Sequence, residues 1–108
     1  MGVKNLASEE YTIIVEFPTS VLFGVNSKKY VTKICLSDSL ITLREVLKKL
    51  NDEFIKSTIF ESYLEGGSGF LVFVNNYLVK DIDGFFKKLI EPNTTNIEIK
   101  ILPIFEGG

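Results

Sequence analysis

The chain has 108 residues, enough for one domain with a modest core. Its apolar share of 45% and charged share of 24% are typical of a globular protein, not a disordered one. The formal net charge is -2 and the lysines occur at most in isolated pairs, so direct nucleic-acid binding, which needs positive charge against the phosphates, is not expected.

Histidine is absent, and Cys35 is the single cysteine. The commonest general base and the commonest zinc ligand are therefore missing, and no Ser-His or Cys-His catalytic pair is available. One cysteine also excludes an intramolecular disulfide and a cysteine-ligated iron–sulfur cluster. Cys35 lies in a strand-like run, where we expect a small buried hydrophobe. A stand-alone enzyme is the least favoured class.

Residues 1–10 are interpreted as a flexible N-terminal extension without the apolar stretch of a signal peptide. No window approaches the length of apolar sequence that spans a bilayer. We therefore expect a cytoplasmic protein that does not contact a membrane.

The first two predicted elements are strands. In residues 11–17, every second residue is apolar and the residues between them are partly polar, as in a strand with one buried face. Pro18 ends this run. After a loop, residues 29–36 form a second strand, with Ile34 and Leu36 directed inward.

A helix follows. Thr42 and Glu45 are spaced as a capping box, in which each side chain satisfies a free backbone donor of the first turn. One apolar stripe then extends over about three helical turns; it consists of Leu43, Val46, Leu47, Leu50 and Phe54. Residues 55–69 are less regular, and the Gly-rich residues 66–69 are interpreted as a linker because neither a Walker loop nor a dinucleotide fingerprint is present.

The C-terminal half contains three more predicted strands. Residues 70–75 are almost continuously apolar, which is typical of a strand buried on both faces. Asn75 and Asn76 tolerate positive φ and predict a tight hairpin with residues 77–80. The last strand, residues 96–102, directs its isoleucines inward.

Between the hairpin and the last strand, Asp81 and Asp83 are interpreted as turn and cap residues. We expect a short helical turn after Asp83, and Pro92 ends it. The turn would bring four apolar residues near the core: Phe85, Phe86, Leu89 and Ile90.

The order strand, strand, helix, strand, strand, turn, strand predicts an α+β protein with the β-grasp (ubiquitin-like) arrangement. In this arrangement a mixed sheet of four to five strands packs on one main helix, and the first and last strands pair in parallel at its centre. We expect the domain to cover residues 11–102 and an extended tail to cover residues 103–108.

The predicted tail ends in Gly107-Gly108. Its residues would reach about 17–20 Å in extended form, enough to carry a terminal carboxylate into the active site of a partner. Glycines lack Cβ, so the receiving channel can be narrow. At average glycine usage, a chain ends in Gly-Gly by chance about once in 200.

Two stretches carry a resemblance to a known family: residues 70–76, and residues 99–108 with their terminal Gly-Gly. Together with the helix start at Thr42 and the loop at residues 22–24, they resemble the sulfur-carrier family. This family includes the small subunit of molybdopterin synthase, the thiamine sulfur carrier, the ubiquitin-related modifier and the small archaeal modifier proteins. The resemblance covers about residues 11–108, and the terminal Gly-Gly is its specific motif.

The resemblance implies that a ubiquitin-activating-type enzyme uses ATP to adenylate the Gly108 carboxylate. Sulfide from a persulfide donor would then displace AMP and leave a thiocarboxylate for molybdopterin synthesis or tRNA thiolation, the former with the large subunit of molybdopterin synthase as partner. The chain itself would bind no cofactor or metal. Gly107 and Glu106 would thread into the partner, and the residues that contact it would be Leu102, Pro103, Ile104 and Phe105. If the helix covers one face of the sheet, Leu71 or Phe73 would lie beside them, although we expect Phe70 and Phe73 to belong to the core.

Two alternatives stay open. A protein modifier would join the activated Gly108 to lysine amines of target proteins. A plain β-grasp interaction module would have an inert tail. The residue pattern does not separate these possibilities from the sulfur carrier.

Overall fold

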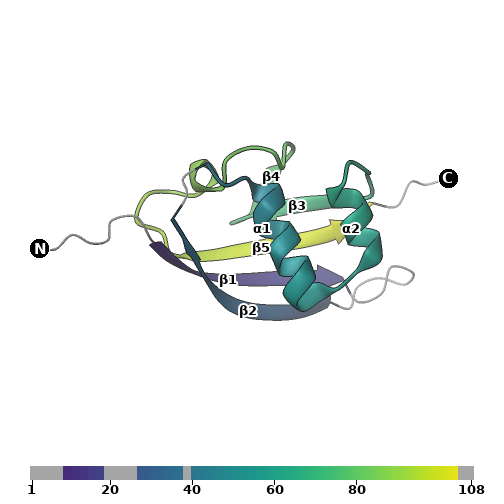
Figure 1. The fold of residues 1–108 in the computed structure, drawn as a ribbon, viewed down its shortest axis with the longest axis horizontal. Coiled ribbons are helices and arrows are strands. Elements are labelled where there is room, and N and C mark those ends of the chain that lie inside the picture. The colour runs from purple at the N-terminus through teal and green to yellow at the C-terminus, as the bar shows by residue number, and fades with distance from the viewer. Residues whose placement is uncertain (1–8, 19–26, 38–39, 105–108) are drawn as a thin grey trace, which may run out of the picture.

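The computed structural model of the protein describes residues 9–18, 27–37 and 40–104. It is an α+β structure in which helices cover one face of a five-stranded sheet (Figure 1). Its elements in chain order are β1 (Glu9–Pro18), β2 (Ser27–Leu36), α1 (Leu43–Leu50), the π-helical segment η1 (Asn51–Ile55), α2 (Thr58–Leu64), β3 (Phe70–Val74), β4 (Tyr77–Val79), the 3-10 helix η2 (Phe86–Leu89) and β5 (Asn96–Pro103).

The sheet is mixed, with the strand order β2-β1-β5-β3-β4. β1 and β5 are parallel, with Ile13 beside Ile97, whereas β1–β2, β3–β5 and β3–β4 are antiparallel. The parallel pairing of the first and last strands at the sheet centre was predicted from the sequence, and the structure confirms it. The last strand is therefore held by neighbours on both sides.

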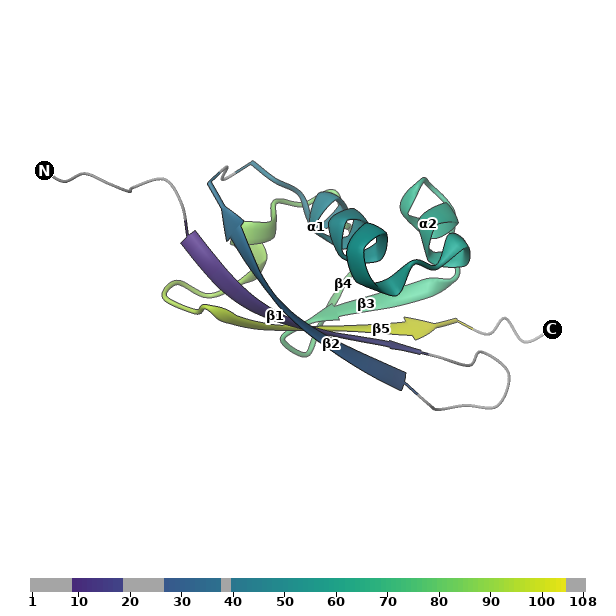
Figure 2. The ribbon, with the colours of Figure 1, turned by 60° about the horizontal axis from the view of Figure 1, so that its bottom comes forward.

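Alternation in the strands produces the core as predicted. In β1, Tyr11, Ile13 and Val15 are buried, and in β5 the three isoleucines are buried. Ile34 and Leu36 of β2 face the same interior. Figure 2 shows α1 and α2 on one side of the sheet, so only the strand positions that point to this side are removed from water.

Helix α1 begins at the predicted capping box. The Thr42 hydroxyl accepts the Glu45 N–H at 3.2 Å, and the Thr42 N–H donates to Glu45 Oε1 at 2.9 Å. The predicted single helix to Phe54 is wrong, because α1 ends at Leu50 and the chain continues as η1. Phe54 still packs against the core from its half-buried position.

Helix α2 lies where the sequence indicated an irregular segment. Ser57 caps it by accepting the Phe60 N–H at 3.1 Å, and Phe60 and Leu64 are buried beneath it. The buried Asn51 side chain fixes the preceding turn, since it accepts the Ser57 N–H at 3.0 Å and donates to the Ser57 carbonyl at 3.1 Å. The helix has only two buried apolar positions, which is too few to give a clear helical period in the sequence.

Strand β3 is buried on one face, not on both as predicted. Val72 and Val74 are buried, whereas Leu71 is exposed and Phe73 is half-buried. The reason is that both helices lie on the same side of the sheet. The hairpin was predicted correctly, and Asn75 and Asn76 adopt φ of 49° and 73°.

The segment before β5 contributes one large side chain to the core. Phe86 in η2 is buried and meets Tyr11 edge-on, with ring centroids 5.9 Å apart. Leu89 and Ile90 pack partly against the core, as expected. Phe85 is exposed instead, so this part of the prediction is wrong. In the part of the chain that the structure describes, no helix combines the length and apolar character required to cross a membrane.

Candidate functional site

The candidate site is the C-terminal end of β5, where the predicted tail begins. The sequence placed the end of this strand at Leu102 because Pro103 lacks an N–H. The structure extends it, with Pro103 opposite Phe70 and the Ile104 N–H donating to the Gly69 carbonyl at 2.8 Å. The following residue thus supplies the donor that proline lacks, and the chain is held to the sheet as far as Ile104.

The predicted site residues divide into two groups. Leu102, Pro103 and Ile104 belong to the structure as described, with Leu102 37% and Ile104 41% exposed and Pro103 half-buried. The remaining members, Phe105, Glu106, Gly107 and Gly108, lie outside the described residues.

An apolar surface lies on the uncovered face of the sheet beside this strand end. Leu102 is directly opposite Leu71 of β3, which is also 37% exposed. Two positions further along β3, Phe73 is opposite Leu78 of β4. We call this surface the exit patch; its residues are Leu71, Phe73, Leu78, Leu102 and Ile104. Large exposed apolar patches on soluble proteins commonly mark sites of protein contact.

The exit patch agrees with the predicted grouping of Leu71 or Phe73 with Leu102 and Ile104. Leu78 was not predicted. Its signal was present in the sequence, because a two-residue hairpin at Asn75 and Asn76 pairs the residue after Tyr77 with Phe73. The register of this hairpin would therefore have placed Leu78 in the patch.

The centre of the uncovered face is charged. A small hollow of about 120 Å³ lies over β1, β5 and the hairpin. Its charged lining alternates in sign: Glu16, Lys29, Glu98 and Lys100. The uncovered face therefore changes from apolar at the exit patch to mixed charge over its centre, a pattern that gives a partner both contact area and register.

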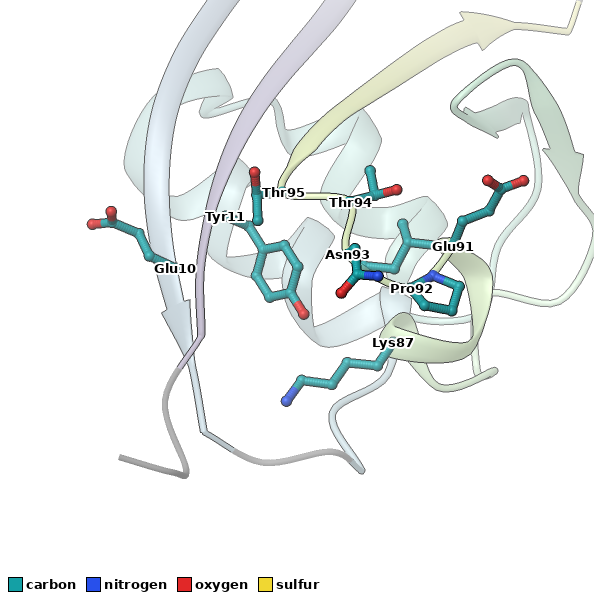
Figure 3. Close-up of a pocket in the computed structure, with 9 residues that line it drawn as sticks. Glu10, Tyr11, Lys87, Glu91, Pro92, Asn93, Thr94 and Thr95 are labelled. Atoms are coloured by element: carbon teal, nitrogen blue, oxygen red, sulfur yellow. The ribbon is translucent and has the colours of Figure 1, made fainter. Parts of the chain in front are cut away.

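A larger pocket, of about 500 Å³, lies at the other end of the strands, where β1 and β5 begin (Figure 3). Figure 3 shows the Tyr11 hydroxyl directed into the same space as Lys87, while the carboxylates of Glu10 and Glu91 point away on opposite sides. The pocket is lined by both polar and apolar residues and lies at the opposite end of the strands from Ile104. Nothing in its lining indicates a reaction at this position.

An ion pair between Arg44 and Asp83 stabilises the fold at some distance from the exit patch. Arg44 of α1 binds Asp83 through two hydrogen bonds, Nε–Oδ1 of 2.6 Å and Nη2–Oδ2 of 3.0 Å, and also donates to the Leu64 carbonyl at the end of α2. The hydrogen bond with Asp83 raises the pKa of Arg44, and that with Arg44 lowers the pKa of Asp83. Asp81 accepts the Asp83 N–H at 2.9 Å, so the predicted turn role is confirmed. The predicted cap role is wrong, because the N-cap of η2 is Phe85 and no side chain caps this turn. This cluster ties α1, α2 and the loop before η2 together.

Cys35 is exposed, and the prediction of a buried side chain is wrong. Its neighbours Ile34 and Leu36 point to the core, so alternation directs Cys35 to the uncovered face. Among the described residues, no three side chains of histidine, cysteine, aspartate or glutamate lie together as metal ligands would.

Comparison of the sequence with protein-family models finds no match, and comparison with curated proteins finds none either. The functional assignment therefore depends on the residues themselves, on the strand arrangement and on the surface at the end of β5.

Proposed function

We propose that this protein is a ubiquitin-like sulfur carrier whose Gly108 carboxylate is activated by a partner enzyme. The observation that carries the proposal is the position of β5. It is the central strand, held by β1 and β3, and it leads the chain out of the sheet beside the exit patch, four residues before Gly108. A partner that binds the patch would receive the tail in a fixed direction.

The strand arrangement supports the finer assignment to the β-grasp fold. The sheet has the order β2-β1-β5-β3-β4, is parallel only between β1 and β5 and has α1 on one face, an arrangement that is compatible with this fold. The helical segments η1 and α2 are additions between α1 and β3. They lie on the covered side of the sheet and leave the exit patch open.

The proposed chemistry places the reacting group on the chain and the catalytic groups on the partner. A carboxylate oxygen of Gly108 attacks the α-phosphate of ATP, and pyrophosphate leaves. The terminal sulfur of a persulfide on the partner then displaces AMP from the acyl-adenylate and forms an acyl disulfide. A second thiol of the partner attacks the donor's inner sulfur, which releases the thiocarboxylate and leaves a disulfide on the partner. Its sulfur would pass to a dithiolene precursor or to tRNA, and the first acceptor would require the molybdopterin synthase large subunit.

The chain's own contribution is recognition and reach. The exit patch would supply apolar contact area, and Lys100 and Glu98 beside it would fix the orientation. Residues 105–108 would carry the carboxylate to the nucleotide. The absence of histidine is compatible with this mechanism, because the partner would supply the groups that transfer protons and bind metal ions.

The test is mass spectrometry of the protein isolated from its own cell. Trypsin cleaves after Lys100 and releases residues 101–108, a peptide without Met, Cys or Lys. Replacement of one oxygen by sulfur in this peptide cannot be confused with methionine or cysteine oxidation. We expect the peptide to begin at Ile101, to end at Gly108 and to be present partly as the thiocarboxylate.

The same digest separates the alternatives. A modifier would leave residues 101–108 as a branch on target lysines, and a protease that cleaves after Glu106 would leave a Gly-Gly branch. An inert tail would give only the unmodified acid. A chain that continues beyond Gly108 in the cell, with no processed form, would contradict both the carrier and the modifier.

A further inference from the structure

The far edge of the sheet has a property that the proposed function does not use. β2 pairs with β1 over ten residues, from Ser27 to Leu36, and no other described strand pairs with it. Figure 1 shows β2 at one margin of the sheet, away from β3 and β4. An edge strand of this length exposes a row of backbone donors and acceptors.

The structure identifies which residues expose them. The Thr12 N–H donates to the Thr95 carbonyl, on the β5 side of β1. Backbone directions alternate along a strand, so Ile13 and Val15 bond toward β2, to their register partners Thr32 and Tyr30. The intervening residues of β2 direct their N–H and C=O groups to the open edge; they are Lys29, Val31 and Lys33.

The side chains of these same three residues lie on the uncovered face. All three are exposed, Val31 at 64%. β2 contains three lysines and no acidic residue, although the whole chain has a net charge of -2. Neither Lys29 nor Lys33 forms an ion pair with a described residue. The edge is therefore positive, with one apolar side chain between two ammonium groups.

We infer that this edge binds an acidic, extended segment of a partner protein, which adds a sixth strand to the sheet beside β2. The expected sequence is acid, any residue, aliphatic, any residue, acid, because these positions would lie opposite Lys33, Val31 and Lys29. The pattern reads the same in both directions, so the segment need not run in one particular direction.

The opposite side of β2 already displays a related arrangement. In the β1–β2 ladder, Glu16 is the register partner of Lys29, and Ile14 is the register partner of Val31. β1 thus supplies an acid and an aliphatic residue at the same spacing as the proposed partner. Opposite charges and apolar pairs across strands each contribute about 0.2–1 kcal/mol in such ladders.

Charge also decides between the acidic segment and a second copy of this chain. Pairing of two β2 edges would bring the lysines of both strands together, and neither copy of β2 contains an acidic residue to pair with them. Lysines on edge strands commonly oppose such self-association. An acidic partner converts the same charges into attraction and steering.

This surface is separate from the exit patch. β1 and β5 lie between β2 and β3, so a strand added to β2 would leave the patch open. The edge would serve a second partner while the activating enzyme holds the tail.

The experiment uses the full-length chain, labelled with ¹⁵N, and a fluorescent peptide with the core Glu-Thr-Val-Thr-Glu flanked by glycines. A peptide with both acids replaced by lysine is the matched control. We expect the acidic peptide to bind and to slow amide hydrogen exchange at Lys29, Val31 and Lys33, while the neighbouring Tyr30 and Thr32, already bonded to β1, change little. Added salt should weaken the binding.

Variants test separately the contribution of the lysine charges and that of the outward backbone N–H groups. The double change Lys29→Glu and Lys33→Glu should weaken the acidic peptide by about tenfold or more. It should also gain binding of the lysine peptide, a result that misfolding cannot produce. Lys80→Glu, one substitution of the same kind beyond β4, should stay within about twofold because distant exposed charges are screened.

Val31→Pro removes one outward N–H and is tolerated on an edge strand, so it should abolish strand addition with little change in the urea midpoint. Failure of the acidic peptide to bind, or binding without protection of the outward amides, would overturn the proposal. Dimerisation of the chain through β2 in the absence of peptide would overturn it as well.

Discussion

The two faces of the sheet use the same strands for different purposes. On the covered face, Ile99 and Ile101 of β5 are 1% exposed beneath α1 and α2. On the other face, Lys100 and Leu102, interleaved with them, are open to solvent. A central strand can therefore anchor the fold with every second residue and present the others to a partner. We expect substitutions on the covered face to change stability and those on the exit patch to change recognition.

The largest effect is expected at Phe60. Its buried ring has Phe17 and Phe70 at 5.2 Å and Tyr63 at 5.7 Å, so Phe60→Ala would empty the centre of an aromatic cluster. We expect a loss of about 3–5 kcal/mol in the free energy of unfolding. Urea denaturation followed by circular dichroism measures it. A loss below about 1 kcal/mol would mean that α2 does not pack on the sheet as described.

A matched leucine pair compares the two faces directly. Leu47 of α1 is fully buried and Leu102 of β5 is partly exposed, and both can be changed to alanine. Leu47→Ala should cost about 2–5 kcal/mol, whereas Leu102→Ala should cost less than about 1 kcal/mol. Equal losses in the urea midpoints would contradict the division between the faces.

The capping box gives a smaller and local effect. Thr42→Ala removes the acceptor of the Glu45 N–H and should destabilise the protein by about 1 kcal/mol. Thr42→Ser keeps the hydroxyl and is the control, expected to restore most of that loss. Equal midpoints for Thr42→Ala and the native chain would show that the box does not contribute.

The smallest effect concerns the pH dependence of the Arg44–Asp83 pair. The hydrogen bond with Arg44 lowers the pKa of Asp83 in the folded state, below the value of about 3.9 for a free side chain. The contribution of Asp83 is therefore complete above about pH 4 and is lost as the pH falls through the lower, folded-state pKa. Because the pair is exposed, the difference should be slight.

The comparison is with Asp83→Asn, which cannot titrate at this position. Between about pH 4 and pH 2 the native chain should lose slightly more stability than Asp83→Asn. Parallel losses in the two proteins, measured by urea midpoints, would show that the pair does not stabilise the fold.

Local patterns in the sequence were sufficient for most of the covered face. Alternation identified the buried isoleucines of β5, the Thr42–Glu45 spacing marked the start of α1, and Asn75-Asn76 fixed the hairpin. These features depend on contacts between residues close in the chain or on a strict period. The central pairing of β1 with β5 also followed from the element order.

Other features depend on tertiary packing and could not be predicted. The sequence could not show that helices cover only one face of β3, because a continuous apolar run is compatible with burial on one face or on both. The end of α1 depends on the hydrogen bonds between Asn51 and Ser57, two residues that a helical period does not connect. The exposure of Cys35, by contrast, could have been predicted, because Ile34 and Leu36 were expected to point inward and alternation then directs Cys35 outward.

At the candidate site, Leu102 was predicted from its place at the end of the last strand, Ile104 from its place after that strand, and Leu71 from the apolar run. The direct opposition of Leu71 and Leu102 required the register of β3 on β5. The outward donors of β2 likewise required the pairing of both strands next to it.

The most direct test combines the exit patch with the chemistry at Gly108. The native chain, Leu71→Glu in the patch and Ile59→Glu on the outer surface of α2 would each be expressed in the cell of origin with an N-terminal tag. The measured quantity is the fraction of the tryptic peptide 101–108 that carries a thiocarboxylate; neither substitution alters this peptide. We predict that Leu71→Glu abolishes the modified fraction and that Ile59→Glu leaves it at the native level. An unmodified peptide in all three proteins, or an undiminished fraction in Leu71→Glu, would contradict the account.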